Sequence, residues 1–181
     1  ATALFSMVKP LVSPAPVTSM PSISVAVNDI EVSTNGSMTV SRTGSLTVNG
    51  NLTGNNNVTL ESDSNEYSSL LVTGSVTGNV EYQRHANITG STGGNDLIAP
   101  PVSGQVFTDF LSDNANIISN AGNTLYLFGP FDKASGSYLL YANTESSTLD
   151  LGTGYRAAST DNGNFSFTGS VNTGNVNVGI L

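Results

Sequence analysis

The sequence predicts an all-β protein, with a repetitive N-terminal β-sheet or short β-solenoid followed by an antiparallel, β-sandwich-like unit. Two observations lead to this prediction. Between residues 28 and 84 one short phrase keeps returning, as Gly-Ser-Met-Thr-Val at 36–40 and Gly-Ser-Leu-Thr-Val at 44–48, and after residue 84 longer and more aromatic strand patterns replace it. Because each repeat is too short to bury a core alone, neighbouring repeats must stack on one another.

Alternating side chains give each repeat an apolar face and a polar face. Successive residues of a strand point to opposite sides, so Leu46 and Val48 share one face and Thr47 lies on the other. The same alternation recurs at Met38 and Val40 and at Val58 and Leu60. Strands that recur every ~8 to 12 residues suit a β-solenoid and an antiparallel meander equally well, and both architectures stay open.

Residues 1–27 are predicted to form a Pro-rich, extended N-terminal arm. Four of the seven prolines lie there, at positions 10, 14, 16 and 21. Proline lacks the backbone N–H that a helix interior or a central strand needs. Within the arm, residues 3–8 read Ala-Leu-Phe-Ser-Met-Val. This apolar stretch has strand propensity, so it could pair with the sheet edge of another copy.

Residues 85–181 are predicted to form the antiparallel β unit. Pro100 and Pro101 end any regular ladder near its start. Residues 106–111 are the one segment with helical character. Further strand patterns occupy residues 124–128, 137–141, 152–158, 165–169 and 176–180.

Charge and composition exclude several kinds of partner. The net charge is −8, only 10% of residues are charged, and Asn occurs 21 times, so amides and hydroxyls dominate the polar surface. An acidic chain without a basic cluster argues against nucleic acid and anionic membranes as partners. No cysteine is present, which excludes disulfides and thiolate metal sites. No apolar run is long enough to span a bilayer, so we expect no membrane insertion.

A search for chemistry assigns no catalytic, cofactor-binding or metal-binding residue. His85 is the one histidine, and it could act as a base only if folding brought Asp96 or Glu81 beside it. An exposed loop histidine is the simpler interpretation. A group of oxygen-bearing side chains faintly resembles a calcium loop but lacks its glycine and distal glutamate, so a solvated turn is favoured. The members of this group are Glu61, Asp63, Asn65 and Glu66.

Six aromatic residues could form a sugar-stacking platform. Most of them lie within strand patterns, where packing in the core is the simpler explanation, and the absence of Trp weakens the carbohydrate interpretation further. They are Tyr126, Phe128, Phe131, Tyr138, Tyr141 and Tyr155.

Three sets of phrases together resemble β-rich extracellular modules of Bacteroidetes, particularly flavobacterial, surface and adhesin proteins exported by the type IX secretion system. They lie at residues 44–53 with 69–84, at 96–102 (Asp-Leu-Ile-Ala-Pro-Pro-Val), and at 154–158 with 165–174. The resemblance covers residues 28 to 178. It implies a non-catalytic module located outside the cell, at the cell surface.

The expected function is therefore that of an extracellular structural or adhesive module of a bacterial cell-surface protein, not an enzyme. Its expected partners are proteins, either further copies of itself or neighbouring domains, or a surface glycan, and no cofactor is expected. Two alternatives stay open. One is a self-assembling filament subunit joined by N-terminal strand addition, and the other is a carbohydrate-binding accessory module of a secreted hydrolase.

Overall fold

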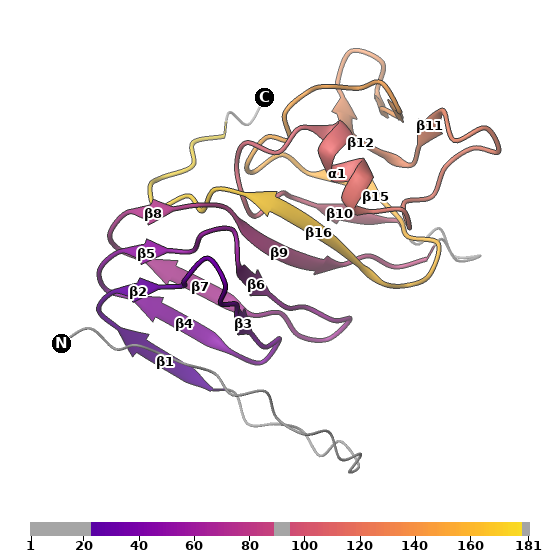
Figure 1. Ribbon diagram of the computed structural model, residues 1–181. Helices are drawn as coiled ribbons and strands as arrows, with labels where there is room; N and C mark the ends of the chain where they lie inside the picture. The colour runs from indigo at the N-terminus through magenta and orange to yellow at the C-terminus, as the bar shows by residue number, and fades with distance from the viewer. Residues whose placement is uncertain (1–22, 89–94, 179–181) are drawn as a thin grey trace, which may run out of the picture.

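The computed structural model describes residues 23–88 and 95–178 (Figure 1). Residues 1–22, which make up most of the predicted arm and include its strand-forming stretch at 3–8, lie outside the described residues. The last part of that predicted arm, Ser24–Val27, forms the first strand, β1. The repetitive region therefore begins at Ser24 and not at residue 28.

Nine short strands wind into three coils of a β-solenoid. Each coil gives one strand to each of three parallel ladders, β1-β4-β7, β2-β5-β8 and β3-β6-β9. The parallel pairing selects the solenoid and excludes the meander. The strands are β1 (Ser24–Val27), β2 (Ile30–Glu31), β3 (Met38–Val40), β4 (Ser45–Val48), β5 (Leu52–Thr53), β6 (Val58–Leu60), β7 (Ser69–Val72), β8 (Val76–Thr77) and β9 (Val80–His85).

Aliphatic side chains of equivalent positions stack along the solenoid axis. Val27 lies beside Val48, and Val48 lies beside Val72 in the next coil. Val48 is fully buried, whereas Thr47 between the inward positions is partly exposed. The prediction of one buried and one wet face per repeat is thus confirmed, since successive residues of a strand point to opposite sides.

The corner between the first two ladders is held by side chains that bond to the next coil. Asp29 Oδ1 accepts a hydrogen bond from the Asn51 N–H at 2.7 Å, and Asn51 Oδ1 accepts one from the Ser75 N–H at 2.9 Å. The chain passes so closely here that a Cβ atom on Gly74 would collide with the backbone oxygen of Gly50. This corner therefore requires glycine at position 74.

Replacing Gly74 by alanine is expected to lower the free energy of unfolding by about 1–3 kcal/mol, because the coils must move apart to admit the methyl group. Gly174→Ala is the matched control, since a Cβ at Gly174 meets no atom within 4 Å. Urea denaturation of both variants measures the difference. Equal midpoints for the two would contradict the close approach of the coils at this corner.

The C-terminal unit continues the third ladder. Strand β16 (Asn164–Gly169) pairs antiparallel with β9 along six residue pairs, giving a sheet ordered β16-β9-β6-β3. The unit that was predicted to begin at residue 85 therefore shares a sheet with the solenoid, and residue 85 lies inside β9. Figure 1 shows β16 and the elements above it closing the upper end of the coils.

The remaining strands build a second sheet and a small ribbon around one helix. The sheet has the order β10-β15-β12-β13, and β11 pairs with β14. Helix α1 (Phe107–Asp113) confirms the helical segment predicted at 106–111. The strands are β10 (Asp96–Ile98), β11 (Leu125–Tyr126), β12 (Phe128–Asp132), β13 (Ser137–Tyr138), β14 (Tyr141–Ala142) and β15 (Tyr155–Ala157).

A single hydrophobic core runs through both parts of the chain. The aliphatic ladders of the solenoid continue upward into a cluster of aromatic rings from α1, β12, β15 and β16. Six of these rings are almost completely buried: Phe107, Phe110, Phe128, Tyr155, Phe165 and Phe167. The all-β prediction is confirmed, with α1 as the one helix of the described residues.

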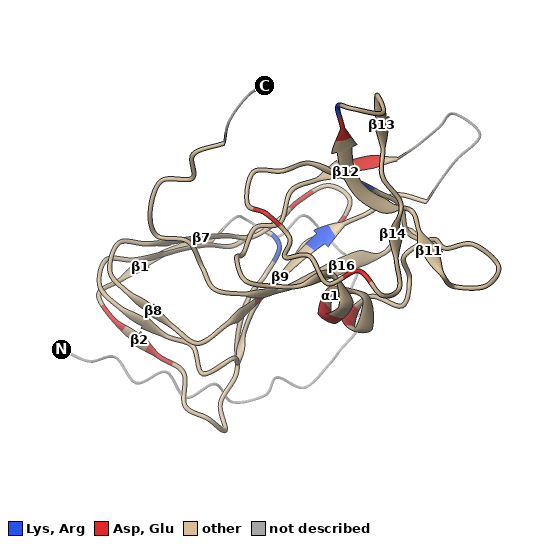
Figure 2. Ribbon diagram, turned by 90° about the horizontal axis from the view of Figure 1, so that it is seen from above, with Lys and Arg blue, Asp and Glu red and all other residues tan. Residues whose placement is uncertain are grey.

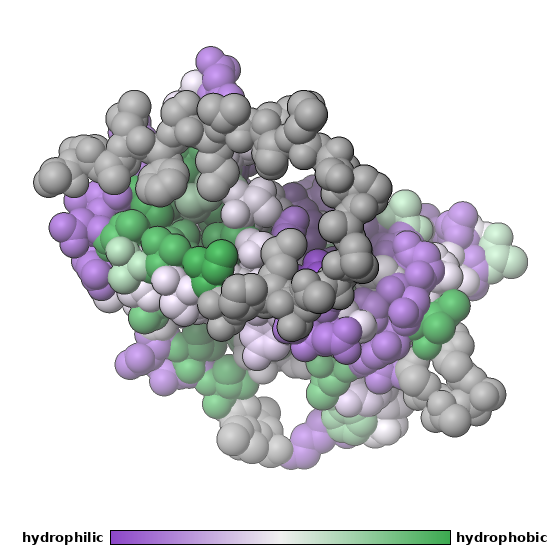
Figure 3. Space-filling view, turned by 90° about the horizontal axis from the view of Figure 1, so that it is seen from below, coloured by the Kyte–Doolittle hydropathy of each residue, from purple (hydrophilic) through white to green (hydrophobic). Residues whose placement is uncertain are grey.

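The lower end of the solenoid carries exposed apolar side chains. Strands β1, β2 and β3 stand at one end of the three ladders, with no further strand of residues 23–88 or 95–178 paired to them. Ile23 is 61% exposed and Val25 is 43% exposed. Seen from below, Figure 3 shows apolar residues gathered at this end of the molecule. Free backbone groups beside exposed apolar side chains make the first coil a potential pairing edge.

Candidate functional site

The second sheet presents a set of apolar, aromatic and cationic side chains to solvent, which we call the outer face. Its members are Leu97 on β10, Arg156 on β15, Phe131 on β12 and Tyr138 on β13. Leu97 is paired with Arg156, and Phe131 is paired with Tyr138, so the members of each pair point to the same side of the sheet. Leu97 is 63% exposed and Phe131 is 53% exposed.

Alternation along the strands explains why this face is separate from the core. Tyr155 and Ala157 flank Arg156 in β15 and are buried, so Arg156 must point away from the core. Phe128 lies opposite Ala157 and is also buried. The sheet therefore divides its aromatic residues between an inner side that stabilises the fold and an outer side that is free to contact other molecules.

The aromatic rings and the guanidinium of the outer face contact one another. The Phe131 and Tyr138 rings lie 5.2 Å apart between centroids and are inclined at 72°, an edge-to-face arrangement. Arg156 Cζ lies 5.3 Å from the centroid of the Tyr138 ring, within the range of a cation–π contact. Phe131, Tyr138 and Arg156 therefore hold one another in place on the surface.

Arg156 forms no ion pair with any Asp or Glu residue, the residues that Figure 2 colours red. All 13 Asp and Glu side chains lie within the described residues, and the ion pairs found there involve Arg42 alone. Arg156 Nε is buried and has no hydrogen-bond acceptor. The buried Nε is closed to a ligand, but the guanidinium charge has no ion-pair partner and the Nη donors form no hydrogen bond within the described residues, so they can serve a bound anion.

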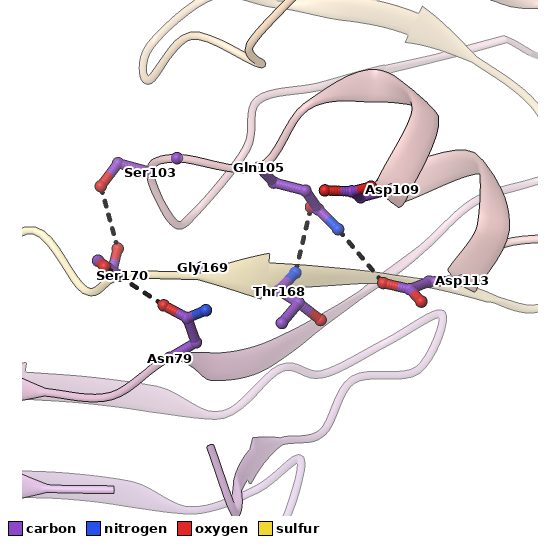
Figure 4. A pocket seen from close by; sticks show the side chains of 9 residues that line it. Asn79, Ser103, Gln105, Asp109, Asp113, Thr168, Gly169 and Ser170 are labelled. Carbon is purple, nitrogen blue, oxygen red and sulfur yellow. Dashed lines mark hydrogen bonds between the residues drawn. The ribbon is translucent and has the colours of Figure 1, made fainter. Parts of the chain in front are cut away.

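A second feature is a polar depression of about 290 Å³ between α1 and the end of β16. Figure 4 shows the Gln105 side chain reaching between Thr168 and Asp113. Gln105 Oε1 accepts a hydrogen bond from the Thr168 N–H at 3.1 Å, and Gln105 Nε2 approaches Asp113 Oδ2 at 3.5 Å. Ser170 donates from Oγ to Asn79 Oδ1 at 3.4 Å on the other side of the depression.

One carboxylate of this depression, that of Asp113, has a raised pKa, but no histidine or cation lines the depression beside it. Partial burial raises the pKa of Asp113, and the nearby Asp109 and Glu81 carboxylates raise it further. The residues that line the depression contribute carboxylates, amides and hydroxyls, with neither an imidazole nor a cation among them. Their hydrogen bonds close the free edge of β16, so the depression is explained by the architecture of the sheet.

The two carboxylates considered as partners of His85 form hydrogen bonds with other residues. Asp96 accepts hydrogen bonds from the N–H and the side-chain amide of Asn87. Glu81 Oε1 accepts from Ser166 Oγ at 2.8 Å and from Gln83 Nε2 at 3.1 Å. His85 itself lies within β9 and not in an exposed loop, and its Nε2 is buried without a hydrogen-bond partner. The interpretation of His85 as an exposed loop residue is wrong, because β9 extends further than the repeat pattern indicated.

The acidic group at residues 61–66 is occupied by turn and ion-pair contacts. Asp63 Oδ1 accepts hydrogen bonds from the N–H groups of Asn65 and Glu66, which lower the pKa of Asp63. Asp63 Oδ2 lies 2.6 Å from Arg42 Nε. Glu61 takes no part in these contacts through its carboxylate. No group of three or more His, Cys, Asp or Glu side chains suited to a metal ion occurs within residues 23–88 and 95–178.

The six aromatic residues considered for sugar stacking separate into two sets. Phe128, Tyr141 and Tyr155 are buried in the core and Tyr126 is partly buried against it, which confirms core packing for most of the group. Only Phe131 and Tyr138 belong to the outer face. Arg156 and Leu97 were missed by sequence reasoning. Alternation in residues 154–158 places Arg156 outward, but only the strand register shows that Phe131 and Tyr138 lie on the same side.

In comparisons with known proteins, no family model, no curated protein and no solved structure matches the chain. The seven-residue helix α1 falls well short of a bilayer, and no helix of the described residues has the length and apolarity of a membrane span.

Proposed function

We propose that the chain is a non-catalytic structural and adhesive module of a bacterial cell-surface protein. The observation that carries the proposal is the continuous sheet β16-β9-β6-β3, which joins the stacked coils to the C-terminal unit. Force applied across the module would load many backbone hydrogen bonds together, because β9 pairs with β6 on one side and with β16 on the other. The outer face then supplies a contact surface on this stiff support.

Two further features support a location outside the cell. The sequence resembles β-rich modules of Bacteroidetes type IX-secreted surface proteins at residues 28–178. The polar surface depends on amides and hydroxyls, with 10% charged residues, and its hydrogen bonds are less sensitive to the salt of an external medium than ion pairs would be.

Display of the chain on bacterial cells is expected to increase their retention on polysaccharide- or protein-coated surfaces under flow. The measurement compares cells that display the chain with cells that display the same anchor alone, at equal surface density. Equal retention would contradict the adhesive role. Release of products from polysaccharide or peptide substrates by the purified chain would contradict the non-catalytic assignment.

A second candidate function is a filament subunit, favoured by the open first coil of the solenoid. Strand addition from the N-terminal arm of a neighbour would cover the exposed Ile23 and Val25 and satisfy the edge of β1. The arm residues that would add, 3–8, lie outside the described residues.

Sedimentation and electron microscopy test this second candidate. The full chain is expected to form concentration-dependent polymers, and both deletion of residues 1–22 and Val25→Lys on the acceptor edge are expected to leave monomers, since a lysine on an edge strand opposes pairing. A monomeric profile for the full chain, unchanged by the deletion, would exclude the filament.

A further inference from the structure

We propose that the outer face binds acidic polysaccharides, whose sugars carry carboxylate or sulfate groups. This inference rests on the proposed adhesive function and names its ligand. The face combines two features that such a ligand requires at neighbouring points. Exposed aromatic rings can stack on the C–H face of a sugar, and a guanidinium without an internal partner can bind the anionic group.

The rings are held in an arrangement that leaves Phe131 open to a ligand. Phe131 is 53% exposed, although it is a large apolar residue within a strand. Its neighbour Tyr138 meets it edge to face, so Tyr138 fixes the orientation of the Phe131 ring without covering both of its faces. Leu97, on the far strand of the same sheet, is 63% exposed and extends the apolar surface. Exposed apolar patches of this kind mark binding sites.

The charge of the ligand follows from Arg156. The chain carries a net charge of −8, so an anion approaches it only where a local cation outweighs the general repulsion. Arg156 supplies that cation beside the rings, and no Asp or Glu side chain forms an ion pair with it. A planar guanidinium can bind a carboxylate or a sulfate through two parallel hydrogen bonds.

The other two arginines are already engaged. Arg42 forms an ion pair with Asp63. Arg84 Cζ lies 4.1 Å from the Tyr82 ring centroid and 4.9 Å from that of Tyr67, and its Nη1 donates to the Gln83 carbonyl. Arg156 contacts one ring only. Of the three arginines, Arg156 is the one whose side chain forms neither an ion pair nor a hydrogen bond within the described residues.

A sugar suits this surface better than an acidic peptide. Extended peptides gain affinity from backbone pairing with a sheet edge, but the edge strands here, β10 and β13, are three and two residues long. Asp96 on β10 would also repel an acidic peptide at that edge. A sugar ring needs only the face of the sheet, where the rings and Arg156 lie.

Affinity electrophoresis and calorimetry of the full chain test the inference. Polygalacturonate and dextran sulfate are the acidic probes, and methyl-esterified polygalacturonate and unmodified dextran are their neutral counterparts. We expect at least about tenfold weaker binding of each neutral polymer, because a charge-assisted contact is lost. Added salt is expected to weaken binding of the acidic polymers. Binding of only one acidic polymer would identify the anionic group and support the inference.

Matched variants localise the binding. Arg156→Gln is expected to remove most of the preference for the acidic polymers. Phe131→Ala is expected to weaken the binding of acidic and neutral polymers alike, by about tenfold. Arg84→Gln and Tyr67→Ala are controls that alter another exposed aromatic–arginine contact, and they should bind as the unaltered chain does. Circular dichroism checks that each variant is folded.

Three outcomes would overturn the inference: no binding of either acidic polymer, equal binding of acidic and neutral polymers, or poly-glutamate binding as tight as that of polygalacturonate. The retention assay separates this failure from failure of the proposed function. Cells displaying Arg156→Gln that are retained as well as those displaying the unaltered chain would leave adhesion intact and reject the outer face as its site.

Discussion

Replacing Phe110 by alanine is expected to lower the free energy of unfolding by about 3–5 kcal/mol. Phe110 is fully buried on α1, and its ring centroid lies 4.6 Å from that of Phe167 and 4.8 Å from that of Phe128. It thereby joins the helix to β16 and to the second sheet. Removing the ring leaves a cavity between three elements that cannot all move inward together.

Phe131→Ala is the control for this loss. It removes the same ring from the outer face, where the residue is 53% exposed, so we expect a loss below about 1 kcal/mol. Urea denaturation followed by far-UV circular dichroism measures both variants. Similar losses for Phe110→Ala and Phe131→Ala would show that the aromatic cluster is not the main core of the C-terminal unit.

Replacing Asn114 by alanine is expected to cost about 2–4 kcal/mol, because two backbone groups of β16 lose their partners. Asn114 Nδ2 donates to the Ser166 carbonyl at 2.9 Å and to the Phe110 carbonyl at 2.7 Å, while Asn114 Oδ1 accepts from the Ser166 N–H at 2.7 Å. A single buried side chain thus takes the place of a neighbouring strand at the free edge of β16.

Hydrogen exchange distinguishes this edge contact from a general loss of packing. In Asn114→Ala the Ser166 amide is expected to exchange faster than the other amides of the β9–β16 ladder. Asn120→Ala is the control, because the hydrogen bonds of Asn120 lie at exposed atoms, where water replaces them. Unchanged protection of the Ser166 amide in a destabilised Asn114→Ala would contradict the proposed role.

The local pattern was sufficient to predict the strands of the repeat. Leu46 and Val48 are buried and Thr47 lies on the opposite face, as alternation requires. The same reasoning did not predict where one strand ends and the next begins when the two pair in different sheets. Residues 124–128 were expected to form one strand, yet β11 ends at Tyr126 and β12 begins at Phe128. Strand β11 pairs with β14, whereas β12 pairs with β13 and β15.

The candidate site shows the same limit. Six aromatic residues were recognised from the sequence, but Tyr155 belongs to the core while Phe131 belongs to the outer face. Both lie in strand patterns rich in apolar residues, and burial depends on which side of the sheet the remaining elements cover. The sequence did not identify Arg156 as a binding residue, because its contact with Tyr138 joins two different strands and depends on how those strands pair.

The sequence by itself determined that the chain is all-β, that residues 28–84 are repetitive, and which side chains face inward at 38–40, 46–48 and 58–60. Those properties are local, since the side chains of any strand alternate between two faces. The tertiary structure alone decided that the repeats pair in parallel as a solenoid, that β16 extends the sheet through β9, and that Arg156 lies beside Tyr138. Pairing joins residues far apart in the chain, and the same alternating strand can pair in parallel or antiparallel, so the partner is chosen by the packing of the whole molecule.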